Sequence, residues 1–121
     1  MHELSIANTI LNIVINEKMI KNLPEINTIG LKIGALSGIL PDALEFSFDA
    51  IKKDTPLANT QLEITEIPVS GICGSCNTKF QVSDLIFACP ECHSTSIKVD
   101  QGQEMDIDYL EIEDEMERVN E

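Results

Sequence analysis

The 121-residue sequence is strongly acidic and poor in aromatic side chains. Acidic residues outnumber basic ones 21 to 8, which gives a formal net charge of −13. This charge repels phosphate groups and so excludes nucleic acid and anionic membranes, while cations and basic protein surfaces remain suitable partners. With one Tyr, four Phe and no Trp, the chain must build a modest core from Ile, Leu and Val, to which a bound metal would add stability.

The first part of the chain alternates a helical pattern with a strand pattern. Residues 4–21 repeat apolar and polar side chains at spacings of three and four, which predicts an amphipathic helix that begins near Glu3. Its apolar face comprises Leu4, Ala7, Ile10, Leu11 and Val14, and its polar stripe Ser5, Asn8, Asn12 and Asn16. The strict alternation that follows in residues 28–33 predicts a half-buried strand with Ile29, Leu31 and Ile33 on one face.

A second helix and two further strands are predicted downstream. Pro41 suits the first position of a helix whose buried stripe is Leu44, Phe48 and Ile51. A strand with Leu62 and Ile64 on one face comes next, and we expect it to continue past Pro68 toward Cys73. After a cysteine-bearing insert, residues 104–109 alternate again as a strand, with Met105, Ile107 and Tyr109 on one face.

This order of elements predicts an α/β fold in which two helices pack on a small mixed sheet, with an inserted four-cysteine zinc-ribbon module. Residues 1–69 form the α/β domain, completed by the strand at about 100–113. Residues 70–99 form the zinc ribbon. Residues 114–121 form an acidic C-terminal tail, which we expect to fray.

The sequence carries no export or membrane signal. Met1 to Glu3 lacks the basic residues that open a signal peptide, and asparagines interrupt the apolar stretch that follows. Nothing approaches the ~20 apolar residues of a membrane span. We therefore expect a cytoplasmic protein, in which thiols stay reduced and paired CxxC elements usually bind metal.

The four cysteines form two CxxC pairs, Cys73/Cys76 and Cys89/Cys92, twelve residues apart. A two-residue gap lets one tight turn aim two thiolates at one ion, and the second pair completes the tetrahedron that zinc prefers. With four protein ligands the zinc has no open position for water, which favours a structural over a hydrolytic site.

Iron binding and disulfide chemistry fit the four thiols less well than zinc does. Iron can occupy the same set as in a rubredoxin-like electron carrier, and spacing alone does not separate the two metals. A thioredoxin-type disulfide motif needs one CxxC at a helix start, and two disulfides do not suit a reducing compartment.

The first three residues are a second candidate ligand set. The α-amine of Met1 and the amide and imidazole nitrogens of His2 can close adjacent chelate rings, with the amide of Glu3 within reach. Nitrogen donors in a plane favour Ni(II) or Cu(II). The first amides of a helix lack intrahelical acceptors, so they are free to bind. Glu3 also suits the positive end of the helix dipole and offers a carboxylate outside the plane.

A histidine at position 2, taken alone, is usually a solvated terminal side chain. A resemblance to a known family supports the interpretation of His2 as a metal ligand. The order and spacing of five segments resemble the HypA/HybF family of hydrogenase maturation factors over essentially the whole chain: Met1-His2-Glu3, residues 31–37 (LKIGALS), residues 44–49 (LEFSFD), the paired CxxC with residues 89–93 (CPECH), and residues 101–105 (QGQEM).

The resemblance implies a nickel metallochaperone for [NiFe]-hydrogenase, with urease as a further recipient in some members. It assigns the nickel site to His2 with Met1 and Glu3, within a nickel-binding domain of residues 1–69, and Zn(II) to Cys73, Cys76, Cys89 and Cys92. The implied partners are the HypB GTPase, the hydrogenase large-subunit precursor and urease accessory proteins. We expect a monomer or weak homodimer.

His93 has two interpretations. It is either an exposed neighbour of the zinc turn or an auxiliary ligand, which replaces a zinc thiolate or gives nickel a distal ligand and so couples the two metals. Some relatives carry a histidine after each CxxC pair, but here Asn77 and Thr78 follow the first pair, so an exchange that needs two histidines lacks one of them.

Three other functions compete with nickel transfer. The main alternative is a structural zinc-ribbon adaptor that docks proteins, with His2 incidental. An electron carrier would hold iron. An enzyme is least favoured, because His2 and Glu3 are the sole acid–base candidates and a chain terminus is a poor place to hold catalytic geometry.

Overall fold

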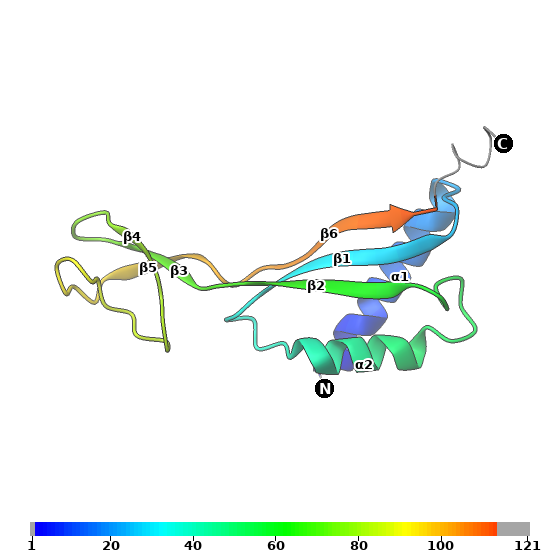
Figure 1. Ribbon diagram of the computed structural model, residues 1–121, viewed down its shortest axis with the longest axis horizontal. Coiled ribbons are helices and arrows are strands. Elements are labelled where there is room, and N and C mark those ends of the chain that lie inside the picture. Colours follow the sequence, from blue (N-terminus) through cyan, green and yellow to red (C-terminus); the bar gives the residue numbers. More distant parts are fainter. Residues whose placement is uncertain (1, 114–121) are drawn as a thin grey trace. The chain divides into compact units, whose positions relative to one another are not determined.

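The computed structural model describes residues 2–113, and of His2 it describes the backbone alone. Within this range two helices and six strands follow one another (Figure 1). In chain order they are α1 (His2–Ile20), β1 (Ile26–Gly34), α2 (Pro41–Ile51), β2 (Gln61–Ile67), β3 (Ser70–Cys73), β4 (Lys79–Gln81), β5 (Ile97–Gln101) and β6 (Met105–Ile112). No helix among the described residues is long and apolar enough to cross a membrane.

The described chain divides into two compact units. The first contains residues 2–31, 39–64 and 107–113, and the second contains residues 32–38 and 65–106. The strands form two three-stranded sheets, with the orders β2-β1-β6 and β4-β3-β5.

In the first sheet β1 and β2 run in the same direction. The Thr60 hydroxyl, just before β2, donates to the carbonyl of Ile26 at the start of β1. At the other end, the N–H of Ala35 donates to the carbonyl of Ile67, the last residue of β2. Parallel neighbours need a crossover connection, and α2 lies between the two strands in the chain (Figure 1).

The third strand of this sheet, β6, runs the opposite way to β1. The N–H of Glu113, after the end of β6, donates to the backbone carbonyl of Glu25, before the start of β1. The N–H of Gly34, at the end of β1, donates to the backbone carbonyl of Glu104, before the start of β6. The sheet is therefore mixed, and the predicted class of two helices with a small mixed sheet is confirmed.

The hydrophobic core of the first unit joins α1, α2 and β1. The buried residues of the predicted apolar face of α1 are Ala7, Ile10, Leu11 and Val14. Leu44 and Phe48 of α2 are buried as well, as are Ile26, Ile29 and Leu31 of β1. Two predictions of burial are wrong. Leu4 is 52% exposed and Ile51 is half-buried, because both line an open apolar depression with Ser5 and Asn8.

The strand predicted to run through Pro68 is instead two strands in different sheets. β2 ends at Ile67 and β3 begins at Ser70. Proline has no N–H to give to a strand ladder, so the pairing of the first sheet stops there. The second sheet is antiparallel throughout, with Gly71 of β3 opposite Phe80 of β4 and Val99 of β5. Cys73 ends β3, so this small sheet fixes the first cysteine of the cluster.

The ring of Tyr109 lies across the central strand of the first sheet. A Cβ added at Gly30 of β1 would overlap Cε2 of this ring. The Tyr109 hydroxyl donates to the carboxylate of Glu63 on β2. One side chain from β6 therefore spans β1 and reaches β2, and it needs glycine at position 30 to do so.

Candidate metal centre

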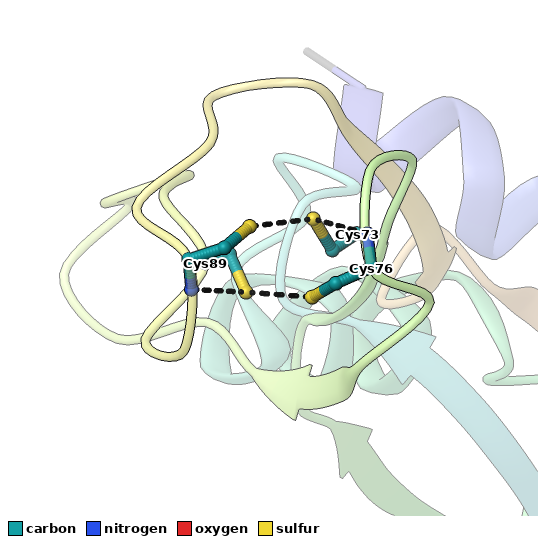
Figure 2. Close-up of side chains that lie close together, drawn as sticks. Cys73, Cys76 and Cys89 are labelled. Atoms are coloured by element: carbon teal, nitrogen blue, oxygen red, sulfur yellow. Dashed lines mark hydrogen bonds between the residues drawn. The ribbon is translucent and has the colours of Figure 1, made fainter.

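The four cysteine sulfurs gather into one cluster in the second unit (Figure 2). All four lie within 4.8 Å of one another, with Cys73 and Cys92 3.5 Å apart and Cys76 and Cys89 3.6 Å apart. A tetrahedron with zinc–sulfur bonds of about 2.3 Å has edges of about 3.8 Å. The sulfurs thus enclose a space that fits a tetrahedral ion, and their separations are far too long for disulfides.

The two CxxC turns have the same hydrogen bonds to their first sulfur. Sγ of Cys73 accepts the N–H groups of Ser75 and Cys76 at 3.3 and 3.5 Å. Sγ of Cys89 accepts the N–H groups of Glu91 and Cys92 at the same two distances. Backbone N–H donors stabilise a thiolate, so each turn prepares its buried first cysteine as a charged ligand.

The equivalence of the two turns extends to the residue after each pair. The N–H of Asn77 donates to the carbonyl of Cys73, and that of His93 to the carbonyl of Cys89, both at 2.9 Å. Both residues have φ of +64°, in the left-handed region. Among residues with a side chain, Asn, Asp and His adopt this conformation most readily. His93 therefore occupies the backbone position that Asn77 occupies in the first turn.

The equivalence also covers the next residue, because Cys73 donates to the carbonyl of Thr78 and Cys89 to that of Ser94. The sequence carries a signal for this relation beyond the spacing of the cysteines. In both turns the second cysteine is followed by a residue suited to positive φ and then by a hydroxyl residue, Asn77-Thr78 in one and His93-Ser94 in the other.

The predicted auxiliary ligand His93 does not join the sulfur cluster. Within residues 2–113 the one group of three or more metal-ligating side chains close enough to share an ion is the four cysteines. The role of His93 in the backbone turn explains why a histidine can occupy this position without binding metal. Any exchange of His93 with a thiolate stays a prediction.

The start of α1 is the second predicted site. Met1 and the side chain of His2 lie outside the described residues. The helix begins at His2, so its first N–H groups lack intrahelical acceptors, as predicted. The carboxylate of Glu3 accepts the N–H of Leu40 at 3.0 Å. Periodicity gives no hint of this contact between residues 37 positions apart.

Comparison with known proteins identifies the family of the chain. The family model HypA, described as hydrogenase/urease nickel incorporation metallochaperone, matches residues 1–112. The chain belongs to the HypA family. The hydrogenase maturation factor HypA of Chloroflexus aggregans is 41% identical over 112 residues, which cover 92% of this chain and 98% of that one. The HypA of Desulfatibacillum aliphaticivorans is 35% identical over 94% of this chain and 88% of its own length.

Solved structures of HypA proteins have the same fold. The solution structure of the nickel metallochaperone HypA from Helicobacter pylori has a TM-score of 0.62 at 24% identity and covers 91% of this chain and 96% of that one. The solution structure of a second HypA protein has a TM-score of 0.71 at 23% identity, over 93% and 96% of the two chains. The family model and the curated relatives confirm the family that the sequence resembles, and these structures confirm its fold.

The cluster of this HypA chain cannot hold four negative thiolates without a cation. The backbone N–H of Cys76, and then that of Ser75, lower the pKa of Cys73 to about 6 against desolvation. A hydrogen bond with the Thr78 hydroxyl lowers the pKa of Cys76. A backbone hydrogen bond from Ser94 lowers the pKa of Cys92, but the Cys73 thiol, desolvation and the other thiols outweigh it and raise the pKa to about 12. A divalent ion would supply the missing positive charge.

Proposed function

We propose that this chain binds Ni(II) at its N-terminus and delivers it during maturation of [NiFe]-hydrogenase, with urease as a possible second recipient, while Zn(II) in the cysteine cluster is structural. The observation that carries the proposal is the family match over residues 1–112, which includes both sites. The family is one of nickel metallochaperones, so the chain's cargo is nickel.

The structural role of zinc follows from the four cysteine ligands. Cys73, Cys76, Cys89 and Cys92 fill all four positions of a tetrahedral ion and leave none for water, so the ion contributes stability rather than catalysis. Binding in such sites contributes ~10–16 kcal/mol of apparent free energy, comparable with the whole stability of a small domain. The short strands β3, β4 and β5 bury few side chains and depend on it.

Nickel binds through nitrogen atoms at the start of the chain in this proposal. The α-amine of Met1, the amide and imidazole of His2 and the amide of Glu3 form a planar donor set of the kind that Ni(II) accepts. Amide nitrogens bind only after losing a proton, and those in the first turn of a helix have no intrahelical acceptor to give up. A terminal site is open to a partner's ligands, so nickel can leave by ligand exchange.

The partners that we propose are the HypB GTPase and the hydrogenase large-subunit precursor, together with urease accessory proteins where urease is the recipient. The net charge of −13 favours basic surfaces on these partners. We propose further that the protein is not an enzyme, that it is a monomer or weak homodimer, and that it works in the cytoplasm, where its four cysteines stay reduced.

A nickel titration of untagged, zinc-loaded protein beside His2→Ala tests the proposal. We expect one equivalent of Ni(II) to bind the parent and at least a hundredfold weaker binding to His2→Ala, because the variant loses one donor and its chelate ring. His93→Ala is the matched control and should bind nickel as the parent does. Equal nickel affinity in all three proteins would favour the structural adaptor instead.

A further inference from the structure

Glu3 makes a contact that joins the start of α1 to the start of α2. Its Oε2 atom accepts the N–H of Leu40 at 3.0 Å. Leu40 is the residue that precedes the first turn of α2, with extended backbone angles of φ −90° and ψ 116°. The contact links the third residue of the chain to a helix that begins 38 positions later.

The second helix lacks the local residues that would make this bond itself. Leu40 has no side-chain acceptor and forms no side-chain cap. In a capping box, a Glu or Gln three residues into the helix accepts the N–H of the capping residue, but that position here is Ala43. Glu3 supplies the missing acceptor from another helix. Its negative charge also lies in the first turn of α1 and beside the start of α2, the positive ends of both helix dipoles.

We propose that Glu3 is a positioning residue for nickel, whose carboxylate ties the first turn of α1 to α2 while its amide nitrogen faces the metal. This inference rests on the nickel site proposed above. The first turn of a helix frays readily because its N–H groups have no acceptors within the helix. An anchor at residue 3 limits that fraying and holds the amides of His2 and Glu3 where one ion can meet them.

A different role for the same carboxylate would be direct coordination of nickel. In that case Oε2 would have to leave Leu40 when nickel binds, and removal of the carboxylate would change the ligand field. The positioning role predicts that the ligand field stays the same, because all four planar nitrogens remain. It also predicts that Gln can replace Glu, since its side-chain oxygen accepts the same N–H.

The experiment compares untagged, zinc-loaded parent, Glu3→Gln, Glu3→Ala and the control Glu45→Ala, which removes an exposed acid from α2. Amide exchange at Leu40 is measured by NMR without nickel. The affinity and the visible absorption band of bound Ni(II) are then measured by titration. For Glu3→Ala we expect about tenfold faster exchange at Leu40 and about five- to tenfold weaker nickel binding with an unshifted band, which corresponds to loss of about one capping interaction.

Glu3→Gln and Glu45→Ala should stay within about twofold of the parent in both measurements. A band that shifts in Glu3→Gln and Glu3→Ala would make the carboxylate a ligand and overturn the inference. Unchanged exchange at Leu40 in Glu3→Ala would overturn it as well. His2→Ala in the same series separates the two proposals, because nickel binding equal to the parent's there would remove the nickel site itself.

A double variant separates anchoring from simple stabilisation of α2. Ala43→Glu in the Glu3→Ala background places a local acceptor for the Leu40 N–H on α2 without any link to α1. We expect exchange at Leu40 to slow toward the parent's rate while nickel binding stays weak. If nickel affinity also returned, Glu3 would act through α2 alone and the positioning role would be wrong.

Discussion

His93 and Asn77 illustrate how a residue can resemble a ligand and yet serve the backbone. Each follows a CxxC pair, each has φ of +64°, and each donates its N–H to the carbonyl of the first cysteine. This geometry favours Asn, Asp and His over other residues that carry a side chain. A histidine next to the cysteine cluster therefore has an adequate structural explanation in this chain.

The variant His93→Asn tests that explanation, because it copies the first turn into the second. We expect zinc coordination by four sulfurs to persist from pH 5 to 8 in zinc-edge absorption, with the free energy of unfolding within about 0.5 kcal/mol of the parent. His93→Val should cost about 1–3 kcal/mol, since a β-branched residue is strained at positive φ. A change in sulfur coordination in His93→Asn would instead support His93 as an exchanging ligand.

Among the elements, the first sheet depends on one aromatic side chain that crosses it. Tyr109 of β6 covers Gly30 of β1 and reaches Glu63 of β2. The expected alternation of Leu62 and Ile64 in β2 is confirmed, with both half-buried. Tyr109 is 40% exposed and Met105 52% exposed, so the apolar face predicted for β6 lies largely toward solvent.

Gly30→Ala should destabilise the protein by about 1–3 kcal/mol, because the new methyl group overlaps atoms of the Tyr109 ring and either the ring or β1 must shift. Urea unfolding of Gly30→Ala, Tyr109→Ala and the double variant measures this coupling. In the Tyr109→Ala background the alanine at position 30 should cost little. Purely additive effects would contradict the close approach of the ring to Gly30.

The sequence predicted both helices, the mixed sheet and the four sulfur ligands, because periodicity and cysteine spacing are local signals. It failed where the outcome depends on what lies against a residue. Leu4 continues the apolar face of α1 yet stays exposed, since it lines an open depression that no element of residues 2–113 covers. The bond between Glu3 and Leu40 was also missed, because no pattern within one element reports a partner 37 residues away.

At the scale of the whole molecule, the two units are stabilised by different means. The first has a hydrocarbon core around Phe48, Leu44 and Ile29. The second contains the four cysteines, and its other buried apolar side chains are Ile33, Val69 and Val82 alone. Metal removal should therefore affect them unequally.

Chelation of zinc at pH 7 should abolish amide protection in β3 and β5 while α1 and α2 keep theirs, as measured by hydrogen exchange with mass detection. Protection of β3 that survives chelation would show that zinc is dispensable for this unit.

Zinc uptake should release protons at pH 7. Cys92, with a pKa raised to about 12, is protonated without metal and must lose its proton to bind. Zinc affinity should accordingly fall as pH falls.

The central claim is that nickel binds through nitrogens at the start of the chain, and the most direct test is nickel affinity with the terminal amine present or blocked. We compare the untagged protein with a variant that carries Gly-Ser before Met1, both zinc-loaded, by titration from pH 8 to 6. The parent should bind tightly at pH 8 and progressively more weakly toward pH 6, because an amine with pKa ~8 and an imidazole with pKa ~6.5 must lose protons. The extended variant should lose this tight binding. Equal, pH-independent affinity in both proteins would contradict the account.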